Sequence, residues 1–92
     1  MPGNRPGFLL DVQSDLLSDL RTRVVVPLYP IGVVARPIGG LNPVFDVAGA
    51  ACVMMTQAIA SIPTAELAPP VARLTGEHDA VVRALDLLLI GL

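Results

Sequence analysis

The sequence predicts a mainly β domain that ends in a single α-helix. Short apolar runs rich in β-branched residues recur along the first two thirds of the chain, as they do in β-strands. Nine prolines and eight glycines interrupt these runs and disfavour long elements. Only the last segment repeats its apolar residues at helical spacing. A length of 92 residues fits one domain, residues 1–92.

The first two expected strands are Phe8–Val12 and Arg23–Leu28, after an irregular N-terminal segment at residues 1–7. Gln13-Ser14-Asp15 separates them, and it is a turn signal because Ser and Asp side chains bond to nearby backbone. Pro27 has no N–H to donate to a ladder, so we expect it at a sheet edge or a strand end.

The middle of the chain predicts a hairpin. Proline and glycine are dense over residues 29–43, where only Val33–Ala35 suggests a brief strand. Pro43–Val47 and Ala51–Met55 then flank a three-residue loop, Ala48-Gly49-Ala50. The glycine of that loop is able to adopt a positive φ, which fits a hairpin connection.

Beyond the hairpin, Gln57–Ile62 is expected to form a short strand or turn, and Pro69-Pro70 a boundary. Within the hairpin, Cys52 is expected to be a small buried hydrophobe. Met54 and Met55 should point to opposite faces of their strand, with at least one in the core.

The C-terminal segment predicts a helix over Ala80–Leu89, with Thr75 as its N-cap and Gly91 as its stop. Glu77 and Asp79 suit the positive end of such a helix. The apolar stripe expected to face the core comprises Val81, Leu85 and Leu88, widened by Val82 and Leu89.

Composition excludes several functional classes. Apolar residues make up 53% of the chain and charged residues 15%, with six basic and eight acidic residues and a net charge of −2. Such a chain lacks the basic field that drives direct nucleic-acid binding. A small domain hides only part of its apolar surface, so we expect a homo-oligomer or a surface for another protein.

The membrane and metal classes are also disfavoured. No stretch approaches the roughly 20 apolar residues of a membrane span, and the N-terminus lacks the apolar region of a signal peptide, so a cytoplasmic location is expected. Asp11, Asp15 and Asp19 recur every four residues, but in an expected strand and turn, and His78 is expected at the surface. We therefore expect no metal, no cofactor and no catalytic group.

A series of motifs in order resembles the CcdB family of toxins. The most specific is Asp-Val-Gln-Ser-Asp followed by the aliphatic pair Leu16-Leu17. The matching segments are Phe8–Asp15, Arg23–Leu28, Leu41–Phe45, Met54–Thr56, Ala60–Pro63, Ala84–Asp86 and Gly91-Leu92.

The resemblance implies a small SH3-like β-barrel with a C-terminal helix, acting as a homodimer. It implies a non-enzymatic toxin of a type II toxin–antitoxin system used in plasmid maintenance. Members of the family bind the A subunit of DNA gyrase, a topoisomerase, trap it on cleaved DNA, and are neutralised by a cognate antitoxin. The gyrase-binding residues implied here are Ile90, Gly91, Leu92, Leu16, Leu17 and Asp86.

Each of these residues also has a plainer interpretation. Ile90, Gly91 and Leu92 are compatible with an ordinary helix end, Leu16 and Leu17 with core packing, and Asp86 with a solvated charge. The family tail is normally Trp-Gly-Ile, and its Trp stacks on a gyrase Arg; Ile90 has no π face for this contact.

Two alternative functions follow. A homologue that binds antitoxin without poisoning gyrase, a decoy or relic, agrees with Ile90. An endoribonuclease toxin of the same fold would need an Arg, a Thr or Ser and an acid together, and Arg21, Thr22 and Arg23 are the candidates. The family also has a strand ahead of Phe8, which is expected to be short or missing here and to leave a strand edge unpaired.

Overall fold

One long central strand organises the sheet of this protein. The computed structural model describes residues 7–34 and 36–91. Strand β2 (Thr22–Pro30) pairs antiparallel with β1 (Phe8–Asp11) along one edge, and with both β4 (Ala50–Met54) and β5 (Ala60–Pro63) along the other. β3 (Val44–Val47) pairs with β4. The resulting order is β1-β2-β4-β3, with β5 beside the first half of β2.

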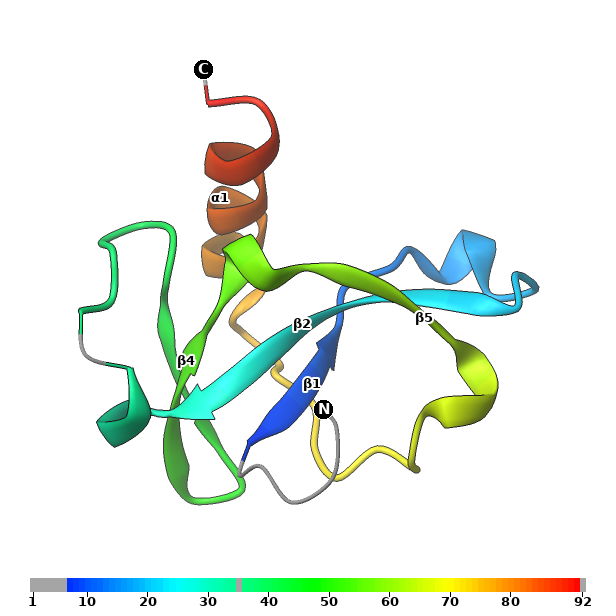
Figure 1. Cartoon of the computed structure of the whole chain (residues 1–92), viewed down its shortest axis with the longest axis horizontal. Helices are drawn as coiled ribbons and strands as arrows, with labels where there is room; N and C mark the ends of the chain where they lie inside the picture. The colour runs from blue at the N-terminus through cyan, green and yellow to red at the C-terminus, as the bar shows by residue number, and fades with distance from the viewer. Residues whose placement is uncertain (1–6, 35, 92) are drawn as a thin grey trace.

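The sheet curls into a half-barrel because β4 and β5 share one edge of β2 (Figure 1). β5 pairs with Thr22–Val25, and β4 pairs with Leu28–Pro30. A 3₁₀ helix, η3 (Thr56–Ala58), carries the chain from β4 to β5 at the changeover. The expected mainly β fold with a C-terminal helix, α1 (His78–Leu89), is confirmed.

Pro27 lies at this changeover, in the interior of the central strand, so its expected place at an edge or a strand end is wrong. Val12 N–H donates to Val24 C=O at 3.0 Å, and backbone groups alternate between the two edges of a strand. The nitrogen of Pro27 therefore faces the edge where β5 has ended and β4 begins. Its carbonyl on that side accepts from Met55 N–H at 2.9 Å. The missing N–H consequently breaks no ladder bond.

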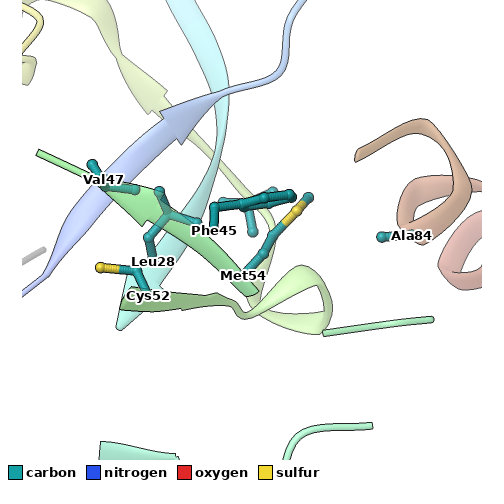
Figure 2. Close-up of a cluster of buried hydrophobic side chains, with 7 residues drawn as sticks. Leu28, Phe45, Val47, Cys52, Met54 and Ala84 are labelled. Atoms are coloured by element: carbon teal, nitrogen blue, oxygen red, sulfur yellow. The ribbon is translucent and has the colours of Figure 1, made fainter. Parts of the chain in front are cut away.

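The core lies on one face of the curled sheet, beneath α1. Alternate residues of β2, β3 and β4 point into it, and Ala84 closes it from the helix. Figure 2 shows this cluster of buried side chains: Val26, Leu28, Phe45, Val47, Cys52, Met54 and Ala84. The burial expected for Cys52 and for one residue of the Met54-Met55 pair is confirmed.

A buried polar group fixes the long loop before β3. The Asn42 side chain accepts from Ile38 N–H at 2.9 Å and donates to Met54 C=O at 3.0 Å and to Gln57 Oε1 at 2.7 Å. Its donors and acceptor are thereby satisfied, which burial of an amide requires. This loop lies beside the helix, since Gly40 lies next to the Leu87 side chain.

Two local expectations are wrong, and a third lies outside the described residues. The segment from Val33 does not form a strand: Ile31–Val33 forms the 3₁₀ helix η2, which packs against β4, and Ala35 lies outside the described residues. Thr75 is not the N-cap of α1, because Gly76 with a φ of +86° turns the chain first and Glu77 occupies the cap position. The expected first strand ahead of Phe8 falls in residues 1–6, outside the described residues.

Two other stretches agree with expectation in part. The segment expected at Gln57–Ile62 divides between η3 and β5, and Pro69-Pro70 lies in the irregular connection after the 3₁₀ helix η4 (Thr64–Glu66). The helix itself begins two residues before the expected Ala80 and ends at the expected Leu89.

The hairpin is confirmed, but its turn has two residues rather than three. Val47 pairs directly with Ala50, which leaves Ala48 and Gly49 with φ angles of +51° and +87°. Positive φ at both central residues defines a type I′ turn, whose twist matches that of the flanking strands. Gly49 adopts this conformation freely, whereas Ala48 pays a steric penalty between its Cβ and the following carbonyl.

We therefore predict that Ala48→Asn raises the free energy of unfolding by about 0.5–1 kcal/mol, because Asn tolerates the left-handed conformation that Ala resists. Urea denaturation followed by circular dichroism measures the change. Ala50→Asn is the matched control, since Ala50 is an exposed strand residue without positive φ, and it should give no gain. An Ala48→Asn variant no more stable than the parent would contradict the assigned turn.

Candidate partner-binding surface

The C-terminal end of α1 presents an exposed apolar tip. Ala84 is fully buried, and Ala80, Val81 and Leu85 pack against the core. These residues hold one face of the helix to the sheet, while its last turn projects away from the sheet (Figure 1).

Leu89 and Ile90 form this tip, with 68% and 64% of their surfaces exposed. Both Leu89 and Val82 were expected in the apolar stripe that faces the core. Both are exposed, so this expectation is wrong for these two residues. Leu89 follows the buried Ala84 by five residues, which places it about 140° around the helix from the core face.

Hydrogen bonds fix the backbone of the tip. Ile90 N–H and Gly91 N–H both donate to the Asp86 carbonyl oxygen, each at 2.9 Å. Gly91 has a φ of +71°, so it ends the helix as expected. The Asp86 side chain is exposed, as is Gly91, and Leu92 lies outside the described residues. The tip is thus a short apolar surface with a carboxylate one turn below it.

A second apolar point lies on the turn after β1. Asp15–Leu17 forms the 3₁₀ helix η1, and the N-cap Ser14 Oγ accepts from Leu16 N–H at 3.2 Å. Leu16 is 95% exposed and Leu17 about half exposed, so their interpretation as core residues is wrong. Ordered exposed leucines of this kind are typical of surfaces that another protein covers.

Five of the six site residues expected from the sequence lie within the described part of the chain, and they fall into two groups. Leu16 and Leu17 share η1, whereas Asp86, Ile90 and Gly91 share the end of α1. Figure 1 shows these groups at separate places: η1 lies near the start of β2 at the right of the view, and the helix end stands at the top. One protomer therefore offers two distinct apolar points.

The residues considered for catalysis are engaged in structure or lie apart. Arg23 Nε and Nη2 donate to the Asp11 carboxylate at 2.7 and 3.0 Å, and these bonds raise the pKa of the guanidinium. Arg23, one of the two arginines considered for an endoribonuclease site, is thus already paired, whereas Arg21 and Thr22 are exposed. Burial, and to a smaller extent the charge of Asp46, raises the pKa of the Cys52 thiol, which disfavours a reactive thiolate.

Residues 7–34 and 36–91 contain neither a metal-binding cluster nor a membrane-spanning helix. There, no three His, Cys, Asp or Glu side chains come together to hold a metal ion, and His78 is exposed at the start of α1. Within the same ranges, no helix has the length and apolar character to cross a membrane.

Sequence reasoning missed two residues that bear on the site. Periodicity predicts Leu89 in the core. Its angular distance from the buried Ala84 is the signal that it lies at the surface instead. Gln13 was assigned to a turn, yet its side chain accepts from Val24 N–H and donates to Leu17 C=O, both at 3.0 Å. The signal for Gln13 is an amide side chain at the end of an expected strand. An amide both donates and accepts, so it can join the strand to the turn that follows.

Comparison with known families agrees with the fold and with the order of the motifs. The family model described as CcdB protein matches residues 2–91 of this chain. That match includes every strand, the helix and both apolar points up to Gly91. The chain therefore belongs to the CcdB family and is a CcdB-like toxin of a toxin–antitoxin system.

Proposed function

We propose that this protein inhibits DNA gyrase by binding its A subunit as a cytoplasmic homodimer, and that a cognate antitoxin of a type II pair neutralises it. The proposed contacts are Ile90, Gly91 and Leu92 at the helix end, with Asp86, and Leu16 and Leu17 on η1. Binding is by surface contact and needs no cofactor or catalytic group. The observation that carries the proposal is the ordered, exposed apolar tip at Leu89 and Ile90.

Burial of the tip supplies the attraction. Covering an exposed Leu or Ile side chain stabilises a complex by roughly 1.5–3 kcal/mol before ordering costs. Those costs are small here, because the helix and the bonds to the Asp86 carbonyl already order the backbone. Preorganisation of this kind leaves more of the burial energy for affinity.

Charge indicates the character of the partner surface. Asp86 lies in the last turn of α1, at the negative end of the helix dipole, and the helix has no basic residue in that turn. A basic group on the partner would relieve this unfavourable arrangement. On η1, Asp15 similarly stands beside the exposed leucines. Both points therefore fit an apolar recess bordered by Arg or Lys.

Poisoning demands more than binding. A ligand shifts a conformational equilibrium only by its difference in affinity for the two states. The toxin must therefore bind gyrase on cleaved DNA more tightly than gyrase on intact DNA. A protein with equal affinity for both states would bind without poisoning, which is the decoy hypothesis. Purified gyrase and supercoiled plasmid separate the two: linear DNA supports poisoning, and capture of the A subunit without linear DNA supports the decoy.

We predict that Ile90→Trp increases gyrase-mediated DNA cleavage. An indole at this exposed position can stack on a cationic side chain, which is worth about 0.5–2 kcal/mol, or roughly a twofold to thirtyfold shift in the half-maximal toxin concentration. Linearised plasmid, quantified over a toxin titration, measures the shift.

Val71→Trp is the matched control for Ile90→Trp. Val71 is 68% exposed, in the irregular segment before α1, so this variant adds the same indole away from the tip. Equal cleavage by both Trp variants would show that the indole acts non-specifically and would contradict a role for position 90.

We also predict that Leu16→Ala weakens binding to the gyrase A subunit by roughly tenfold, since it removes apolar area buried in the complex. Its free energy of unfolding should stay within about 0.5 kcal/mol of the parent, because the side chain is 95% exposed. Calorimetric titration and urea denaturation measure the two quantities.

Val33→Ala is the control for Leu16→Ala, since Val33 is 60% exposed on a different 3₁₀ helix, η2. The Val33 variant should bind as the parent does. If Leu16→Ala and Val33→Ala bind gyrase equally well, η1 is not part of the interface.

A further inference from the structure

Gln13 connects the end of the β1–β2 ladder to η1. Its backbone follows Val12, whose N–H makes the last ladder bond to Val24 C=O. The Gln13 Oε1 then accepts from Val24 N–H at 3.0 Å, while Nε2 donates to Leu17 C=O at 3.0 Å. One amide thus joins the central strand to the last residue of the turn.

The backbone of Gln13 is itself held in place. Gln13 N–H donates to Asp11 Oδ1 at 3.0 Å, and Arg23 Nη2 lies 3.4 Å from the Gln13 carbonyl oxygen. The same Arg23 forms the two-pronged ion pair with Asp11. Charge-assisted, bidentate bonds of this type fix geometry as well as adding energy. The amide therefore projects from a rigid base.

The turn that it reaches has little else to hold it. η1 is three residues long and contains no buried residue, and short 3₁₀ turns are weakly stable by themselves. Leu16 projects into solvent and gains no packing within the protomer. Its order rests on the Ser14 cap, on the turn's own backbone bonds and on the Gln13 bond to Leu17 C=O.

We propose that Gln13 is a positioning residue for gyrase binding: by bonding Val24 N–H and Leu17 C=O together, it holds Leu16 and Leu17 in the conformation that the partner binds. This inference rests on the proposed function of η1. Gln13 contributes by lowering the ordering cost of the turn on binding, and it does so through the leucines rather than by touching the partner.

Gln13→Glu keeps one hydrogen bond of the amide and removes the other. A carboxylate still accepts from Val24 N–H, but it has no N–H for Leu17 C=O and places two acceptors face to face. The variant should keep the parent's unfolding free energy and helix content, yet release the turn. Gln57→Glu is the control for the added charge, because the Gln57 side chain accepts from Asn42 Nδ2 at 2.7 Å and Glu preserves that bond.

The first measurement is hydrogen exchange of the Leu17, Ser18 and Leu20 amides, which bond within the turn. Gln13→Glu should accelerate their exchange while the Val26 and Met54 amides of the sheet keep their rates. Gln57→Glu should leave all of these rates unchanged. Unchanged exchange in the Gln13→Glu turn overturns the proposal.

The second measurement is affinity for the gyrase A subunit in a double-mutant cycle with Leu16→Ala. Gln13→Glu should weaken binding roughly threefold to tenfold in the parent and by a smaller factor in the Leu16→Ala background, because part of its effect passes through Leu16. Equal weakening in both backgrounds overturns the proposal. If the unaltered protein fails to bind gyrase, the proposed function fails, and the exchange rates decide independently whether Gln13 holds the turn.

Discussion

The constraint on which the rest of the structure depends is that β2 shares one edge between two strands. β4 and β5 pair with opposite halves of that edge, and Pro27, which has no N–H, lies where the pairing changes over. The Pro27 carbonyl accepts from Met55 N–H at this point, so the edge keeps a hydrogen bond without the N–H. The changeover also places η3, which contacts both β2 and α1. The position of the helix, and with it the apolar tip, thus follows from how the central strand is paired.

This arrangement leaves a core too small for the apolar content of the chain. The buried cluster is built from medium-sized side chains, with Phe45 as its one buried aromatic residue among those that the structure describes. Large apolar side chains therefore remain outside, among them Leu16, Leu89 and Ile90. Two of these three positions are the helix tip and the third is a hydrogen-bonded turn. Exposed apolar side chains on ordered backbone favour binding, since little entropy remains to be lost on association.

The sequence predicts those elements whose signal is local. The Val24–Val26 run, the hairpin around Gly49 and the periodic C-terminal segment all form as expected, because propensity and pattern agree there. The errors occur where tertiary pairing decides. Pro27 is tolerated inside a strand only because the ladder changes partners beside it, and Val33 forms a 3₁₀ turn against β4. For the site, the family resemblance identified Leu16 and Ile90, whereas their exposure and the bridging amide of Gln13 depend on three-dimensional contacts.

Under the proposed function, Ile90 and Gln13 control different free energies. A homodimer binding a symmetric target presents each residue twice, so any change at the tip acts at two contacts. The residue at position 90 affects how well the toxin distinguishes gyrase on cleaved DNA from gyrase on intact DNA. An aromatic ring there would stack in one direction, whereas burial of the aliphatic Ile90 is not directional. Gln13 orders the free protein before either complex forms, so it changes affinity for both states alike and leaves their ratio untouched. A decoy would consequently retain the need for Gln13 while losing the need for an aromatic tip. This chain has the Asp11–Gln13–Arg23 hydrogen bonds together with Ile90 at its tip. Under the proposed function, the hydrogen bonds would act on affinity for gyrase, and Ile90 would act on the preference for cleaved DNA.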